Sequence, residues 1–182
     1  DTTFNESDLP LKYAGYSYCY RYEKGSYGKD VRGILRVHEF RKIEMVVFAL
    51  PSESDKIHEE LREIEEEIWQ ELEIPYQLIK QATGDLGNAA SRKYDIEAWM
   101  PSQAKYREVT STSNTTDFQA RRLGIKVKIK NENHYLHTLN GTALALGRAM
   151  IAVYENYQNE DGSITVPKVL QKWMEKDVIP VK

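Results

Sequence analysis

Short apolar and aromatic stretches alternate with polar loops along most of the chain, a pattern typical of β-strands. Aromatic and small residues fill positions 13–22, after which glycines interrupt the segment EKGSYGKDVRG. A return strand is expected to begin near Ile34 and to continue through IEMVVFAL up to Pro51. Further strands are predicted in the segments YQLIKQA, YDIEAWM, YREVTSTS, IKVKIK and LHTL.

Three stretches have the spacing of helices instead. In 52–73 apolar residues recur at intervals of three and four, which predicts a helix with Ser52 as its N-cap and with Arg62 and the glutamates facing solvent. The residues expected to face the core are Ile57, Leu61, Ile64, Ile68 and Leu72. A second helix is predicted from Gly141 to Tyr157, and a short one in PKVLQKWM, with Pro167 in its first turn.

These elements favour a single α+β domain spanning residues 1–182, an antiparallel sheet flanked by helices. A chain of 182 residues is long enough for one sizeable core and short for two domains of ordinary size. It begins with Asp1 and a polar segment, so we expect it to be part of a longer protein.

The composition fits a cytoplasmic protein. Cys19 is the one cysteine of the sequence, which excludes an internal disulfide and a multi-cysteine zinc site within it. We expect no membrane partner, because no apolar run has the length needed to span a bilayer. The formal net charge is -3, so binding of nucleic acid would need a local basic patch. The candidate patch is Arg121, Arg122, Lys126, Lys128 and Lys130, for which a solvated strand edge protected by lysines is the favoured interpretation.

Several charged residues interrupt predicted strands or helices. They are Arg21, Glu23, Glu44, Glu108 and Arg148. Any one of them is more often a structural ion pair than a ligand contact. Together they favour a polar pocket for a charged small molecule, because a buried charge needs a partner.

The segment from Glu23 to Gly33 contains glycines and three basic residues, Lys24, Lys29 and Arg32, that could close over phosphates. Its spacing is neither that of a P-loop nor that of a dinucleotide fingerprint. Phe40, on the returning strand, could stack on a base or be an ordinary core aromatic. The residues alone thus predict an anion-binding α+β domain.

Three long blocks resemble the class II aminoacyl-tRNA synthetases in their seryl form. The first, CYRYEKGSYGKDVRGILRVHEFRKIEM, is similar to motif 2 of that family. The second, TGDLGNAASRKYDIEAWMPSQAKYREVTSTSNTTDFQARR, resembles its serine-specific strands, and the third, HTLNGTALALGRAMIAVYENYQ, its motif 3. Nearly the whole chain is covered. The resemblance implies the C-terminal part of a catalytic core that makes seryl-adenylate from ATP and serine and passes the seryl group to tRNA(Ser).

The resemblance also implies roles for individual residues in ATP binding. Arg21 would hold the α-phosphate, Phe40 would lie under the adenine, and Arg148 would cover the base and reach the γ-phosphate. Glu108 and Ser111 match the family's Mg²⁺ ligands. Arg21, Glu108 and Arg148 would be the catalytic residues. The remaining ATP contacts implied are Tyr22, Glu23, Arg36, Val37, Val109 and Thr110.

The serine contacts implied are Glu44, which would pair with the ammonium group, together with Asn140 and Thr142. A site that hydrogen-bonds a small hydroxyl rejects alanine, because its polar groups would stay unpaired. The family's N-terminal coiled-coil arm, its motif 1 and its T-x-E segment are not among the matched blocks. Since motif 1 forms the family's dimer interface, a homodimer is expected where that motif is present.

Two other hypotheses stay open at this point. One is a truncated or paralogous remnant that binds nucleotide without charging tRNA. The other is a related ligase that loads an amino acid onto a carrier protein. The latter resembles zinc-dependent relatives with cysteine-rich pockets, which Cys19 alone could not supply, so it ranks last.

Overall fold

The computed structural model describes residues 1–23 and 33–181. Most of the segment predicted to close over phosphates, including Lys24, Lys29 and Arg32, lies outside the described residues. The strands are β1 (Thr2–Asn5), β2 (Leu11–Tyr20), β3 (Glu39–Ala49), β4 (Tyr76–Lys80), β5 (Arg92–Met100), β6 (Lys105–Asn114), β7 (Ile125–Ile129), β8 (Glu132–Tyr135), β9 (His137–Ala145), β10 (Ile164–Thr165) and β11 (Val178–Ile179). The α-helices are α1 (Ser54–Glu71), α2 (Phe118–Leu123), α3 (Leu146–Tyr157) and α4 (Lys168–Met174).

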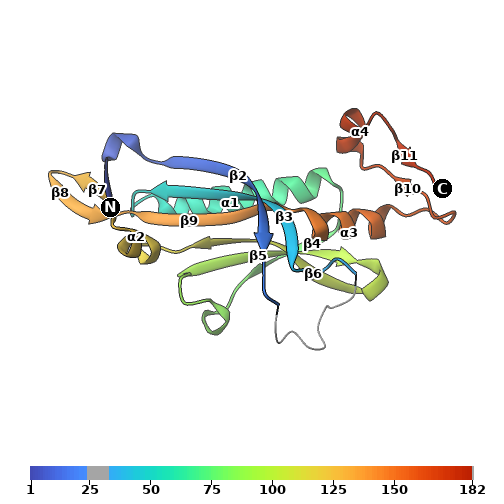
Figure 1. Ribbon diagram of the computed structural model, residues 1–182, viewed down its shortest axis with the longest axis horizontal. Coiled ribbons are helices and arrows are strands. Elements are labelled where there is room, and N and C mark those ends of the chain that lie inside the picture. The colour runs from blue at the N-terminus through green and yellow to red at the C-terminus, as the bar shows by residue number, and fades with distance from the viewer. Residues whose placement is uncertain (24–32, 182) are drawn as a thin grey trace.

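A six-stranded sheet in the order β2-β3-β9-β6-β5-β4 forms the centre of the molecule, and its neighbouring strands are antiparallel. The smaller sheet β1-β7-β8 lies at one end with the N-terminus, and α4, β10 and β11 lie at the other with the C-terminus (Figure 1). This is the predicted α+β arrangement.

The helices α1 and α3 cover one face of the large sheet. Residues of β3 and β9 such as Val47 and Leu139 pack against Ile57 and Leu61 of α1. Trp69 of α1, strand β5 and the alanines of α3 form a second apolar cluster beside it. Because side chains alternate between the faces of a strand, residues next to these core positions point to the opposite face. That face carries the polar residues of the candidate site.

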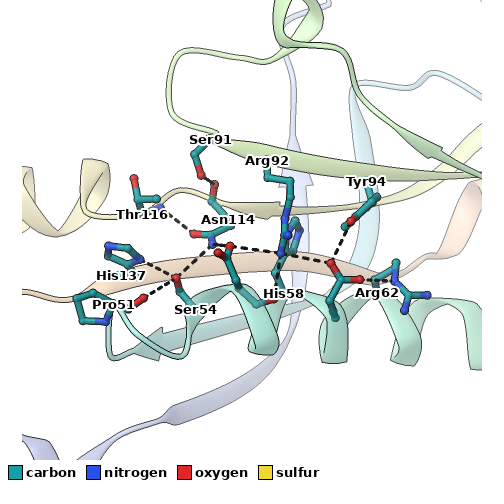
Figure 2. Close-up of polar contacts among 12 residues, drawn as sticks. Pro51, Ser54, His58, Arg62, Ser91, Arg92, Tyr94, Asn114, Thr116 and His137 are labelled. Atoms are coloured by element: carbon teal, nitrogen blue, oxygen red, sulfur yellow. Dashed lines mark hydrogen bonds and ion pairs between the residues drawn. The ribbon is translucent and has the colours of Figure 1, made fainter.

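A buried polar network fastens the N-terminal end of α1 to the sheet (Figure 2). The hydroxyl of Ser54 lies 2.7 Å from Nδ1 of His137 and accepts a hydrogen bond of 3.3 Å from Asn114. Further along the helix, Nδ1 of His58 accepts a hydrogen bond of 2.9 Å from Nε of Arg92 on β5. Burial lowers the pKa of His58, which therefore stays neutral and can accept this bond. The network fixes which residues of α1 meet the sheet.

Several predicted boundaries are wrong. The return strand starts at Glu39 rather than near Ile34, and Glu53 rather than Ser52 is the N-cap of α1. Residues from Gly141 to Ala145 belong to β9, so the helix after them starts at Leu146. Strand β7 is the central strand of its sheet, so its lysines do not protect an edge.

The predicted faces of α1 need one further correction. Ile64, expected in the core, is 42% exposed, whereas Glu65 is 0% exposed. The buried stripe therefore runs through Leu61, Glu65 and Trp69, which follow one another at intervals of four. The expectation that every glutamate of this helix faces solvent is wrong at Glu65.

Candidate active site

A cavity of about 140 Å³ opens on the face of the sheet that α1 leaves uncovered. Its walls come from the residues that follow β2, the segment leading into β3 and the start of that strand, the middle of β6, the end of β9 and the start of α3. The lining includes most of the predicted residues: Arg21, Glu23, Arg36, Val37, Phe40, Glu108, Val109, Thr110, Ser111, Thr142 and Arg148. Residues far apart in the sequence thus converge on one space.

Three predicted residues do not line this cavity. Glu44 lies beside it and contacts Thr142, which does line it. Asn140 lies two residues before Thr142 on β9, and its backbone oxygen accepts a hydrogen bond of 3.0 Å from the hydroxyl of Thr112. Tyr22 is largely exposed.

Positive charge is concentrated around Arg148, in the first turn of α3. Its Nη1 donates to the backbone oxygen of Glu108 and lies 3.7 Å from a carboxylate oxygen of the same residue. Burial lowers the pKa of Arg148; Glu108 opposes this, and the charges of Arg21, Arg107 and Arg36 lower the pKa further. An anion in the cavity would relieve this mutual repulsion, so the arrangement favours a ligand with several negative charges.

An aromatic surface lies beside these cations. The guanidinium carbon of Arg21 is 5.0 Å from the centre of the Phe40 ring. The backbone N–H of Arg21 donates a hydrogen bond of 2.9 Å to the backbone oxygen of His38. Nε of Arg36 donates to Glu23 over 2.6 Å. The cavity therefore combines cations with a flat apolar surface, which suits a ligand that has both anionic groups and a ring system.

A second polar cluster joins β3 and β9 through Lys42, Glu44 and Thr142. Nζ of Lys42 lies 2.6 Å from Oε2 of Glu44, and the hydroxyl of Thr142 donates to the same oxygen over 3.0 Å. Lys42 also donates to the Thr142 hydroxyl over 3.2 Å. The Glu44 carboxylate can bind an ammonium group, and the Thr142 hydroxyl can hydrogen-bond another hydroxyl. Together they suit a small ligand that carries both groups.

Two irregularities in the sheet bring these groups together. The register between β3 and β9 shifts after Ile43, so that Glu44 is paired with Thr142. The register between β5 and β6 shifts after Ile96, so that Glu97 is paired with Glu108. Bulges of this kind re-aim side chains and are common next to active sites. Neither could be predicted from the alternation of polar and apolar residues.

Lys42 lines the cavity but was not among the predicted site residues. Its position two residues before Glu44 on the same strand was an available signal, since residues two apart share a face. Because it neutralises Glu44, a cationic ligand would compete with it for that carboxylate.

Glu108 and Ser111 could contribute oxygen ligands to a cation, and both line the cavity. Among the described residues no group of three or more acidic, histidine or cysteine side chains is arranged to hold a metal. Mg²⁺ commonly takes one or two protein oxygens and completes its shell with water and substrate phosphates. The two donors therefore fit a Mg²⁺ ion that is held mainly by a phosphorylated ligand.

No helix within the described residues is both long and apolar enough to cross a membrane.

Comparison with known proteins identifies relatives of the entire chain. Residues 1–157 match the model of the tRNA synthetase class II core domain (G, H, P, S and T). The serine–tRNA ligase of Rubrobacter xylanophilus is 53% identical over 180 residues, and that of Methanospirillum hungatei is 54% identical over 177. These matches cover 98% and 96% of this chain but 42% of each relative. The chain thus spans about two-fifths of the length of these relatives.

Solved structures give the same result. The seryl-tRNA synthetase of Pyrococcus horikoshii complexed with ATP is 50% identical and superposes with a TM-score of 0.96, covering 100% of this chain and 41% of that one. The cytoplasmic serine–tRNA ligase of Naegleria fowleri in complex with AMP is 42% identical, with a TM-score of 0.93, and covers 99% and 43%. The fold of these structures is the one described above.

Proposed function

Because the chain belongs to the class II tRNA synthetase core family (G, H, P, S and T), we propose that it supplies the ATP and serine sites of a serine–tRNA ligase. The observation that carries the proposal is the convergence of Arg21, Glu108 and Arg148 on one cavity, with Thr142 at its side. Since the chain spans two-fifths of its relatives, activation of serine and its transfer to tRNA are proposed for the protein of which it is a part.

In this proposal the arginines align the triphosphate for attack by the serine carboxylate on the α-phosphate. Two anions must meet, so the main tasks are alignment and neutralisation of charge. Arg21 binds the α-phosphate, and its planar fork strengthens its hydrogen bonds as charge builds in the transition state. Arg148 binds the γ-phosphate, and the ring of Phe40 carries the adenine. The repulsion of Arg148 by the neighbouring arginines supports this assignment, because phosphate groups would offset it.

The remaining nucleotide contacts follow the walls of the cavity. Glu23 and Val37 contact the base, with Arg36 held by Glu23 near the phosphates. Val109 and Thr110 flank the nucleotide along β6. We include Tyr22 through its backbone, because its side chain is exposed.

The serine site is proposed to lie at Glu44 and Thr142, with Asn140 next to them on β9. The substrate ammonium takes the place of Lys42 at the Glu44 carboxylate, and the Thr142 hydroxyl bonds the substrate hydroxyl. The existing bond between Thr142 and Glu44 supports this, because both groups already face each other across 3.0 Å. Alanine would leave the Thr142 hydroxyl without its substrate partner.

We propose that Glu108 and Ser111 would hold a Mg²⁺ ion that binds together with ATP. When bound, it would neutralise charge on the phosphate oxygens. The further partners proposed for the whole protein are tRNA(Ser) and a second copy of itself, in the cytoplasm.

Serine-dependent exchange of pyrophosphate into ATP tests the proposal. We expect exchange with serine and at least tenfold less with alanine, and expect Arg21→Ala and Arg148→Ala to abolish it. Arg122→Ala is the matched control, because Arg122 is an exposed arginine of α2. If the chain needs other parts of the protein for activity, exchange should appear when the segment that precedes the matched region in its relatives is added. Absence of exchange even then would instead favour a nucleotide-binding remnant.

A further inference from the structure

Glu65, in the middle of α1, is a fully buried acid to which the proposed chemistry gives no role. Within the described residues neither of its carboxyl oxygens has a hydrogen-bond partner. An unpaired carboxyl group in a core is costly, and an apolar residue would satisfy the helical pattern better. Its presence therefore requires an explanation.

The carboxyl group lies directly behind Gly141 of β9. A Cβ atom placed on Gly141 would lie 2.7 Å from Oε1 of Glu65 and 3.0 Å from the hydroxyl of Thr112. Real Cβ atoms do not approach other atoms so closely, so the acid occupies the space that a side chain at position 141 would need. Glu65 and Gly141 are matched in size across the contact between helix and sheet.

Gly141 lies between Asn140 and Thr142, which are both proposed serine contacts. Since successive residues of a strand face opposite sides, Gly141 faces α1 while Thr142 faces the substrate side. Thr110, which lines the cavity on β6, lies close enough to Glu65 for its hydroxyl to lower the pKa of the acid and so oppose the effect of burial, although the two side chains form no hydrogen bond of ordinary geometry. The carboxyl group thus supports two strands from behind, at the level of the proposed substrate contacts.

The protonation state of Glu65 agrees with a packing role. Burial, the largest cause, raises its pKa to about 9. The charged groups around it act in both directions: Glu44 and Asp95 raise the pKa, and Lys42 lowers it. At neutral pH the group is therefore an uncharged acid, with a shape and polarity close to those of a glutamine side chain.

We propose that Glu65 is a positioning residue of the serine site: its carboxyl group fills the space behind Gly141 and thereby sets the distance between Thr142 and Glu44. The inference rests on the proposed function in so far as serine is the ligand. Glu65 does not touch the substrate, and it acts through the strand that does.

Four variants test the size match: Glu65→Ala, Glu65→Gln, Gly141→Ala and the double variant Glu65→Ala with Gly141→Ala. We expect Glu65→Ala and Gly141→Ala each to raise the KM for serine about tenfold while the KM for ATP changes less than about twofold. Glu65→Gln should keep the wild-type KM for serine. The double variant should return towards it, because the new methyl group enters the space that the acid has left. Glu67→Ala, at an exposed glutamate of the same helix, is the matched control.

A second readout does not depend on activity. The backbone amide NMR signals of Asn140 and Thr142 should move in Glu65→Ala and in Gly141→Ala, and should return in the double variant. Glu65→Asp, which keeps the acid and shortens it, should show a smaller displacement and replaces Glu65→Ala if that variant does not fold.

The outcomes separate this inference from the proposed function. If the wild-type protein shows no serine-dependent exchange, the proposed function fails, and the amide signals still decide the inference. Unchanged signals in Glu65→Ala, or additive effects in the double variant, would overturn the inference. So would a Glu65→Ala variant that loses thermal stability while its KM for serine is unchanged, because that is the behaviour of a merely structural residue.

Discussion

Replacement of Glu65 by glutamine should change how the stability of the protein depends on pH. In the folded protein burial raises the pKa of Glu65 from its ordinary 4.5 to about 9. Between these values the folded state keeps a proton that the unfolded state has lost, so the free energy of unfolding decreases as the pH rises. The slope for one such group is about 1.4 kcal/mol per pH unit. Glutamine cannot ionise, so the variant lacks this slope.

The magnitude follows from the same pKa. Over three pH units, from about 5.5 to 8.5, the wild-type protein should lose up to about 4 kcal/mol of stability relative to Glu65→Gln. Partial opening of the helix would reduce this figure, because solvent could then reach the ionised group. The difference should be small at the acid end and largest at the alkaline end.

Urea denaturation of both proteins at a series of pH values measures this difference directly. Titration of His58 and His137 affects both proteins alike, so it cancels when one curve is subtracted from the other. Glu67→Gln, at an exposed glutamate of the same helix, is the matched control for the substitution itself. A flat difference for Glu65→Gln, or one that grows towards acid pH, would refute the assignment of a neutral buried acid.

Three further predictions concern the site and its support. Thr142→Val should raise the KM for serine about tenfold or more and reduce discrimination against alanine, whereas Thr142→Ser should keep most of both, as exchange kinetics would show. Arg148→Ala should weaken ATP binding about 10- to 100-fold by calorimetry, and Arg148→Lys should recover part of it; equal affinities would contradict the phosphate contact. Asn114→Ala should lower the free energy of unfolding by about 1–3 kcal/mol, because it leaves buried groups near α1 unpaired. Asn133→Ala, on exposed β8, should leave denaturation curves unchanged.

Much of the fold could be predicted from the sequence, because strand and helix periods are local properties. The predicted strands and the three predicted helices exist where the pattern placed them, apart from their ends. The short strands β1, β8, β10 and β11 and the short helix α2 were not predicted. The sequence predicts a helix from Gly141 onwards, because the helical spacing that follows continues through small and apolar residues that fit either period. In the structure the stretch pairs with β3, and this tertiary contact decides its conformation.

Glu65 shows the limit of this reasoning. A period of three to four residues makes Ile64 and Glu65 near neighbours on the helix, and hydrophobicity alone favours burying isoleucine. The network at Ser54 and Arg92 sets the rotation of the helix, and that rotation turns Glu65 towards the space above Gly141. No local pattern contains this information.

The charged residues that interrupt predicted strands or helices are a useful signal for the site, since Arg21, Glu108 and Arg148 line one cavity. Their convergence depends on strand order and on two bulges, which the sequence does not encode in a readable way. A lysine on a strand is usually solvated, so only its spacing of two residues from Glu44 indicates that Lys42 belongs to the site.

The most direct test of the account is the binding of a non-hydrolysable sulfamoyl analogue of seryl-adenylate, measured by calorimetry beside the corresponding alanyl compound. We expect saturable binding at one site, at least about tenfold tighter for the seryl compound and lost in Arg21→Ala. Equal affinity for the two compounds, or binding that survives Arg21→Ala and Arg148→Ala together, would contradict the claim that this cavity holds ATP and serine.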